Sequence, residues 1–129
     1  MRLIDTLVSV ELFRDTGSPV GLQADQLLEA DAGACESIVM EILSGARDEA
    51  QLADLRLLMA RCTTLRTESV NHQVAVALLR QCRCNGKAPR TMMDCLIAVG
   101  AIRTNVALLQ MDQNFVVLAA NSALRLAEA

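Results

Sequence analysis

The chain has 129 residues, 53% of them hydrophobic, and its formal net charge is −3. This length suits one domain with a sizeable core, which we expect to span residues 1–129. The negative charge argues against a basic coat for nucleic acid, and a content of two Phe with no Trp or Tyr argues against a platform for stacking bases.

The cysteine and histidine content argues against a zinc site. The five cysteines form no C-x-x-C pair and are accompanied by a single His, so the usual zinc ligand sets are missing. Free thiols favour a reducing compartment, and we expect the protein in the cytoplasm. An acid interrupts the apolar start of the chain, which argues against a signal peptide, and no apolar run is long enough to span a bilayer.

The hydrophobic pattern predicts strands that alternate with helices along the chain. The strands are expected at 2–5, 32–35, 63–67, 106–109 and 124–126. The helices are expected at 7–13, 20–30, 37–43, 49–61, 70–84 and 116–121, with a further helix that starts at Pro89 and ends near 103. This alternation is typical of βαβ units and therefore of an α/β fold with a mainly parallel sheet.

Four acidic residues stand in apolar surroundings or at the ends of strands: Asp5, Glu41, Asp94 and Asp112. Asp5 ends one buried strand and Asp112 comes three residues past another, and ligands of open α/β sheets bind at the carboxyl ends of strands. Glu41 and Asp94 interrupt apolar helices, where a carboxylate without a partner is costly. Taken together, the four acids indicate one acidic pocket.

Each acid also has a purely structural interpretation. Asp5 suits the N-cap of a helix, and Asp112 suits a turn. Glu41 is compatible with simple exposure to solvent, and Asp94 with an ion pair to Arg90 one helical turn earlier.

An acidic pocket of this kind predicts a divalent cation. Two carboxylates about 4 Å apart repel by roughly 4 kcal/mol at an effective dielectric of 20, so several remain ionised together only when a cation holds them. Hard oxygen ligands select Mg²⁺ or Mn²⁺, and such an ion suits phosphodiester hydrolysis. We expect all four acids to be catalytic, with Asp5, Asp94 and Asp112 as the metal ligands.

A basic run lies just before Asp94. Arg80, Arg83, Lys87 and Arg90 occur in a stretch without acids. Such a run is either a solvated face or a contact for phosphates. We expect Arg83, Lys87 and Arg90 to bind the substrate.

Four segments carry a resemblance to a known family: Ile4-Asp5-Thr6, Met40-Glu41-Ile42-Leu43-Ser44-Gly45-Ala46, Met93-Asp94-Cys95-Leu96-Ile97-Ala98 and Met111-Asp112-Gln113-Asn114-Phe115. In order and spacing they resemble the motifs of VapC-type toxins, the PIN-domain ribonucleases of bacterial toxin–antitoxin pairs. The resemblance implies a PIN-like three-layer fold with a mainly parallel five-stranded sheet and helices on both faces. The four acids fall on the family's acidic positions, and Arg90 falls on a commonly basic one.

The resemblance also implies activity and partners. It implies an Mg²⁺- or Mn²⁺-dependent endoribonuclease that acts on RNA. It implies a homodimer, which a small antitoxin neutralises in a heterotetramer or larger complex. We expect the antitoxin to contact apolar residues of the early helices: Leu12, Phe13, Leu27, Leu28, Leu55 and Leu58.

Several residues depart from the family's motifs, and the last motif has also lost the basic residues around Asp112. Leu7 stands where the family usually has Ser or Asn, Ser9 stands where it has a large apolar residue, and Asn114 replaces the second acid of the last motif. These changes predict weakened activity. A non-catalytic PIN domain that retains antitoxin binding is the alternative. A receiver-type phosphoacceptor domain fits less well, because Asp5 has no adjacent acid and Lys87 precedes a helix.

Overall fold

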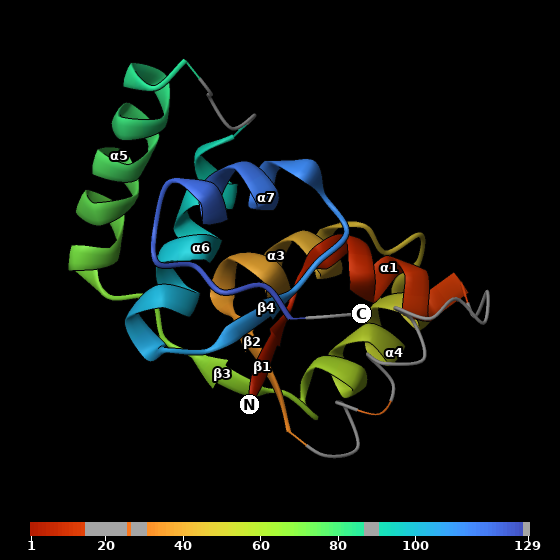
Figure 1. Ribbon diagram of the computed structural model, residues 1–129. Helices are drawn as coiled ribbons and strands as arrows, with labels where there is room; N and C mark the ends of the chain where they lie inside the picture. Colours follow the sequence, from red (N-terminus) through yellow and green to blue (C-terminus); the bar gives the residue numbers. More distant parts are fainter. Residues whose placement is uncertain (15–25, 27–30, 87–90, 128–129) are drawn as a thin grey trace.

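The computed structural model describes residues 1–14, 26, 31–86 and 91–127. Strands and helices alternate in this part of the chain, as the pattern predicts (Figure 1). The strands are β1 (Arg2–Ile4), β2 (Ala32–Cys35), β3 (Thr63–Leu65) and β4 (Ala107–Leu109). The helices are α1 (Thr6–Arg14), α3 (Glu36–Ser44), α4 (Glu49–Met59), α5 (Ser69–Cys84), α6 (Met92–Thr104) and α7 (Gln113–Ala120).

The strands form one parallel sheet in the order β3-β2-β1-β4. Leu3 of β1 pairs with Gly33 on one side and with Leu108 on the other. The expected fifth strand at 124–126 is reduced, in the described part of the chain, to an isolated parallel bridge between Leu126 and Leu108. The sheet therefore has four strands rather than five, and β1 and β4 lie side by side.

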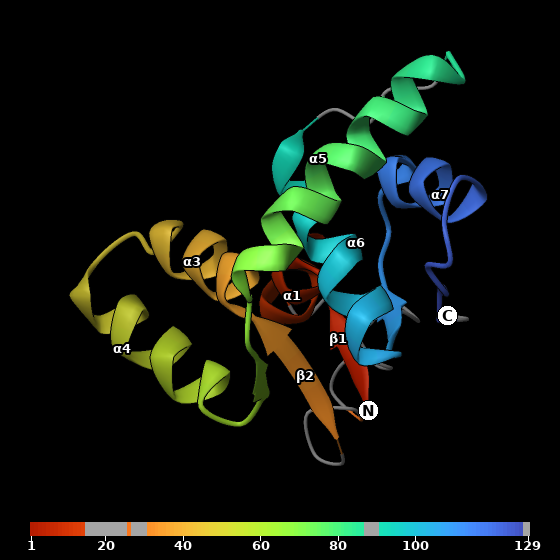
Figure 2. The same ribbon diagram turned by 90° about the vertical axis from the view of Figure 1, so that its left-hand side faces the viewer.

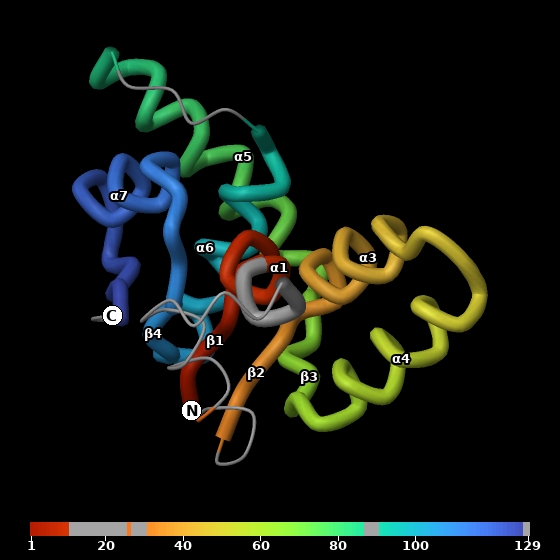
Figure 3. Tube along the Cα trace, turned by 90° about the vertical axis from the view of Figure 1, so that its right-hand side faces the viewer, coloured from red at the N-terminus to blue at the C-terminus, as the bar shows by residue number. Residues whose placement is uncertain are grey.

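Helices cover both faces of the sheet. Helices α5 and α6 lie on one face (Figure 2), whereas α1 and α4 lie on the other (Figure 3). Helix α3 continues from β2 and contacts α1, α4 and α6. This arrangement confirms the predicted three layers.

The apolar strands supply the core on both faces. Leu3 and Leu108 are fully buried in the larger core, which also contains Phe115. Their neighbours Ile4 and Leu109 belong to a smaller core on the opposite face. Successive side chains of a strand point to opposite faces, and this explains why β1 and β4 read as continuous apolar runs.

Polar side chains fix where several helices begin. Asp48 accepts a hydrogen bond from the backbone N–H of Gln51 at 2.8 Å, as expected for the N-cap of α4. Thr91 caps α6, so this helix begins at Met92 rather than at Pro89, which lies outside the described residues. Helix α7 is longer than expected because Asp112 caps it. The expected helix at 20–30 lies largely outside the described residues.

None of the helices that the structure describes is both long and apolar enough to cross a membrane.

Candidate active site

Asp5 occupies the centre of the sheet's carboxyl edge. It follows β1, and its backbone N–H donates to the carbonyl of Leu109 at 3.0 Å, which ties it to the end of β4. The chain adds β2 and β3 on one side of β1 and then adds β4 on the other side. The gap between β1 and β4, where the order of the strands switches, is the usual ligand crevice of an open α/β sheet. Asp5 is therefore placed where a functional carboxylate is expected.

The surroundings of Asp5 favour its protonated form. The residue is only 4% exposed, and burial is the largest effect that raises the pKa of its carboxyl group. Hydrogen bonds from the backbone N–H groups of Thr6 and Leu7 lower this pKa, while the charges of Asp94 and Glu41 raise it again. The net result is a pKa of about 6 instead of 3.8. Asp5 thus caps α1 and is also coupled to two other acids.

Glu41 and Asp94 approach the site from two different helices. Glu41 lies on an exposed position of α3, yet partial burial and the charge of Asp94 raise its pKa. Asp94 lies in the first turn of α6, where Thr91 accepts a hydrogen bond from its backbone N–H at 3.2 Å. The structure therefore brings Asp5, Glu41 and Asp94 within electrostatic reach of one another.

Asp112 joins this group through Asn114. The Asp112 carboxylate accepts a hydrogen bond from the backbone N–H of Asn114 at 2.9 Å, and the Asn114 side-chain amide donates to Oδ2 of Asp94 at 3.0 Å. The backbone N–H of Asp112 donates to the side-chain oxygen of Gln110 at 2.6 Å. Asp112 is thus both the predicted site residue and the cap of α7.

The donor set suits a hydrated hard cation better than a closed protein cage. In the described part of the chain, no three His, Cys, Asp or Glu side chains converge closely enough to hold a metal ion. Mg²⁺, however, usually keeps several waters and takes only one or two carboxylates directly. The mutual repulsion of Asp5, Glu41 and Asp94 is the feature that such an ion would relieve.

A cavity of about 540 Å³ opens beside Glu41. Thr6 lines it, and the buried Thr6 hydroxyl has no hydrogen-bond partner among the described residues. Ile42 and Leu55 contribute apolar surface, and Arg47 contributes a cation. A buried hydroxyl next to carboxylates, without a partner in the described part of the chain, is suited to hydrogen bond to an enclosed water.

Two of these residues carried a weak signal or none in the sequence. Thr6 could have been found from its position directly after Asp5. Nothing in the sequence singled out Arg47, because the cavity forms only when the distant helix α1 packs beside α3 and the connection to α4.

Two of the departures from the motifs now have a structural setting. Ser9 is buried, and its hydroxyl and backbone N–H both donate to the Asp5 carbonyl, at 3.2 and 3.1 Å. Leu7 is 45% exposed, while its backbone N–H donates a hydrogen bond to the Asp5 carboxylate. Leu7 therefore supports Asp5 through its backbone, and its side chain does not seal the site.

The basic run is described only in part. Arg80 and Arg83 are exposed on α5, and the charge of Arg83 acts on Cys95, the neighbour of Asp94. Lys87 and Arg90 lie outside the described residues, and with them the alternative ion pair between Arg90 and Asp94.

The expected antitoxin contacts on α4 belong at least partly to the core. Leu55 is buried in the larger core, and Leu58 packs against the smaller one. The side chains of Leu12, Phe13, Leu27 and Leu28 lie outside the described residues. Helical periodicity marks which residues are apolar, but it does not separate a core face from a partner face.

The raised pKa of Asp5 predicts how pH affects the metal-free protein. Between pH 3.8 and about 6 the folded state binds a proton that the unfolded state has released, so stability falls as pH rises. In Asp5→Asn this contribution is absent. With EDTA present, the free energy of unfolding of the wild type should therefore fall relative to the variant's between pH 4 and pH 7, by up to about 3 kcal/mol.

Urea denaturation at several pH values measures this difference. Asp54→Asn, on an exposed position of α4, controls for the loss of a carboxylate. Wild-type and Asp5→Asn stabilities that run parallel across this pH range would contradict the assignment.

Comparison with known proteins identifies the family. The sequence pattern of the PIN domain matches residues 2–121. Ribonuclease VapC11 of Mycobacterium tuberculosis (strain ATCC 25618 / H37Rv) and VapC ribonuclease Mb1587 of Mycobacterium bovis are each 37% identical over 123 residues, which cover 92% of this chain and 92% of theirs. The crystal structure of VapBC2 from Rickettsia felis, bound to a DNA fragment from their promoter, contains a chain with the same fold, at a TM-score of 0.80 and 16% identity over 98% of this chain and 96% of that one. The chain therefore belongs to the PIN-domain family, among its VapC-type ribonuclease toxins.

Proposed function

We propose that this protein is the ribonuclease toxin of a bacterial toxin–antitoxin pair and that it cuts RNA with Mg²⁺ or Mn²⁺. The single observation that carries the proposal is the coupling of Asp5, Glu41 and Asp94 at the carboxyl edge of the sheet. The 37% identity to VapC ribonucleases over nearly the whole chain supports the same activity. The free thiols are compatible with the cytoplasm.

The acidic side chains have different proposed roles in phosphodiester hydrolysis. A bound Mg²⁺ or Mn²⁺ supplies charge neutralisation and an activated water. Asp5 and Asp94 would hold the ion, with Asp112 contributing directly or through water. Glu41 would accept a proton at its carboxylate, since its raised pKa makes it a stronger base than an ordinary Glu. The Thr6 hydroxyl would hydrogen bond to a water or a phosphate oxygen.

Replacement of Asp94 tests this assignment and separates it from a non-catalytic PIN domain. Asp94→Asn removes a charge with little change in volume, so the fold should persist while Mn²⁺ affinity and RNA cleavage are lost. The metal-free variant should melt at the same temperature as the wild type or higher, because one source of repulsion is gone. Calorimetry with Mn²⁺ and cleavage of a structured RNA measure the two effects, with Asp54→Asn as the control. An unchanged Mn²⁺ affinity in Asp94→Asn would rule the site out.

We expect the activity to be weak rather than absent. Leu7 offers no side-chain oxygen at a position where Ser or Asn would offer one, and Asn114 brings an amide where a carboxylate would attract the cation. Changes next to a metal site commonly cost about 10- to 100-fold in affinity or activity. All four acids of the site remain, which is why some cleavage should persist.

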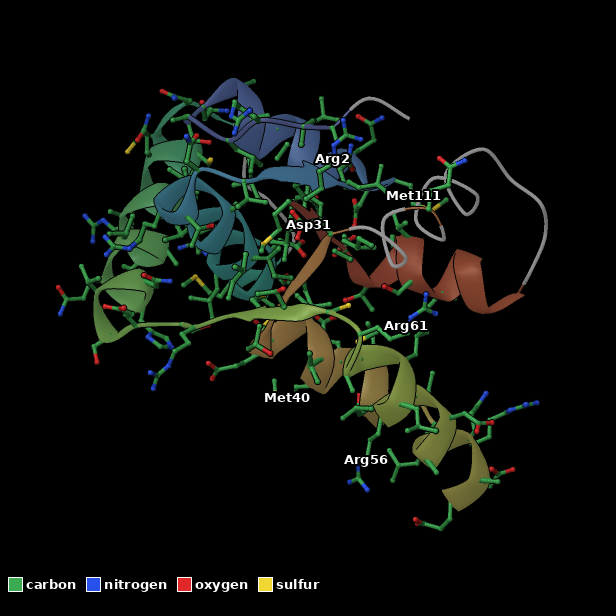
Figure 4. The ribbon with its side chains drawn as sticks, turned by 90° about the horizontal axis from the view of Figure 1, so that it is seen from below. Arg2, Asp31, Met40, Arg56, Arg61 and Met111 are labelled. Carbon is green, nitrogen blue, oxygen red and sulfur yellow. The ribbon has the colours of Figure 1, made fainter. Side chains whose placement is uncertain are left out.

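The basic run is the proposed path of the RNA. Arg83 is exposed on the helix that packs against α6, so phosphates bound there would pass close to Asp94. Removing two cations with Arg83→Ala plus Lys87→Ala should reduce the slope of log affinity against log salt by about 1.4 for single-stranded RNA. Arg56→Ala plus Arg61→Ala removes the same charge on and just after α4 and should leave the slope unchanged (Figure 4). An equal slope of log affinity against log salt in both double variants would mean that the basic run is a solvated face and does not contact RNA.

The antitoxin is the proposed protein partner. The solved relatives include a toxin–antitoxin complex from Klebsiella pneumoniae. In this chain the cavity beside Glu41 has apolar surface from Val10, Ile42 and Leu55, next to the acidic site. An antitoxin segment that lies there could place a cation against the acids and compete with the metal ion.

A second copy of the chain is proposed to cover a groove with an apolar floor. Its apolar residues are Met40, Ala75, Val76, Met92, Met93 and Leu96, and its polar residues are Glu36, Ser37, Thr67 and His72. Two adjoining cavities of about 340 and 220 Å³ share His72, Met93 and Leu96. Met40 projects from α3 into solvent (Figure 4) and is 57% exposed, although it is apolar. The family's homodimer would bury these side chains, and methionines adapt well to such contacts.

Sedimentation velocity measures the oligomeric state. Val76→Glu places a charge on the apolar floor of the groove and should give a monomer, while Leu57→Glu on α4 should remain a dimer. A wild type that is monomeric at high concentration would refute the proposed interface.

A further inference from the structure

Asn114 is the residue of this site that changes its chemistry most. It stands where the VapC-type motif has a second acid, in the first turn of α7 and close to Asp94. An Asp at this position would face Asp94 with a like charge. An Asn at this position faces it with a hydrogen-bond donor.

The two nitrogens of Asn114 contact two different acids. Its backbone N–H donates to Oδ1 of Asp112 at 2.9 Å, and its side-chain Nδ2 donates to Oδ2 of Asp94 at 3.0 Å. Both distances are those of well-formed charge-assisted hydrogen bonds. Asn114 therefore links the start of α7 to the first turn of α6 through the carboxylates themselves.

The link rests on a rigid support. Asn114 precedes Phe115, which is fully buried in the larger core, and α7 packs against α6. The amide is therefore held in place by the same packing that holds the helix, and it binds one oxygen of Asp94.

We propose that Asn114 is a positioning residue that orients Asp94 without metal. With Asn at this position the site binds the cation less tightly, and the metal-free protein is more stable. This inference rests on the proposed function, because it takes Asp94 as a ligand of the ion. A carboxylate at position 114 would attract the cation more strongly and would repel Asp94 when the cation is absent. The amide removes both effects. The toxin is thereby made to respond to the supply of the divalent ion while its fold does not depend on that ion.

The experiment compares Asn114→Asp with Gln113→Glu. Both variants add one negative charge to the first turn of α7, where the helix dipole favours acids equally. Gln113 is exposed, so only Asn114→Asp adds the charge against Asp94. Melting temperatures with EDTA and Mn²⁺ affinities by calorimetry are measured for both variants, for Asn114→Ala and for the wild type.

The proposal predicts opposite shifts with and without metal. Without metal, Asn114→Asp should melt several degrees below Gln113→Glu. With Mn²⁺ it should bind about 10- to 100-fold more tightly than the wild type and recover its melting temperature. Asn114→Ala should bind Mn²⁺ more weakly than the wild type, because Oδ2 of Asp94 loses the hydrogen bond from Asn114.

Two results would overturn the proposal. One is an equal metal-free melting temperature for Asn114→Asp and Gln113→Glu, and the other is a Mn²⁺ affinity that Asn114→Asp does not raise. Failure of the proposed function looks different: none of the four proteins, including the wild type, would then bind Mn²⁺ at the site.

Discussion

The carboxyl group of Asp5 is buried at the end of the central pair of strands, and two other acids act on it. Burial is the largest of the effects that raise its pKa to about 6, and the charges of Asp94 and Glu41 contribute to the same rise. A carboxylate kept in such a place destabilises the metal-free protein at neutral pH unless something offsets the charge. Backbone N–H groups of Thr6 and Leu7 offset part of it. We propose that a divalent cation offsets the rest.

The fold makes this arrangement possible because it brings separate segments to one edge. β1 and β4 are adjacent and parallel, so their carboxyl ends place Asp5 near the start of α7. Helices α3 and α6 contact each other and add Glu41 and Asp94. The apolar runs on both sides of each acid build the cores on the two faces of the sheet. The same short segments therefore supply both the apolar core that stabilises the fold and the acids of the candidate site.

The alternation of strands and helices and the grouping of Asp5, Glu41 and Asp94 could be predicted from the sequence. Apolar runs next to turn residues indicate elements, and the ordered motifs indicate the family. The contact between Asn114 and Asp94 could not be predicted, because it joins helices that meet only in the folded chain. The role of Ser9 is local by contrast: its hydroxyl donates to the Asp5 carbonyl four residues earlier instead of filling apolar space, and a comparison of side-chain size alone does not show this.

We propose that a divalent cation relieves the repulsion among Asp5, Glu41 and Asp94. Anomalous diffraction from crystals grown with Mn²⁺ tests it most directly, because the ion is located without reference to activity. A Mn²⁺ peak between the carboxylates of Asp5 and Asp94, within reach of Glu41 through water, is the predicted result. A map from Mn²⁺-saturated crystals with no peak beside these acids, or with its strongest peak elsewhere on the protein, would contradict the account.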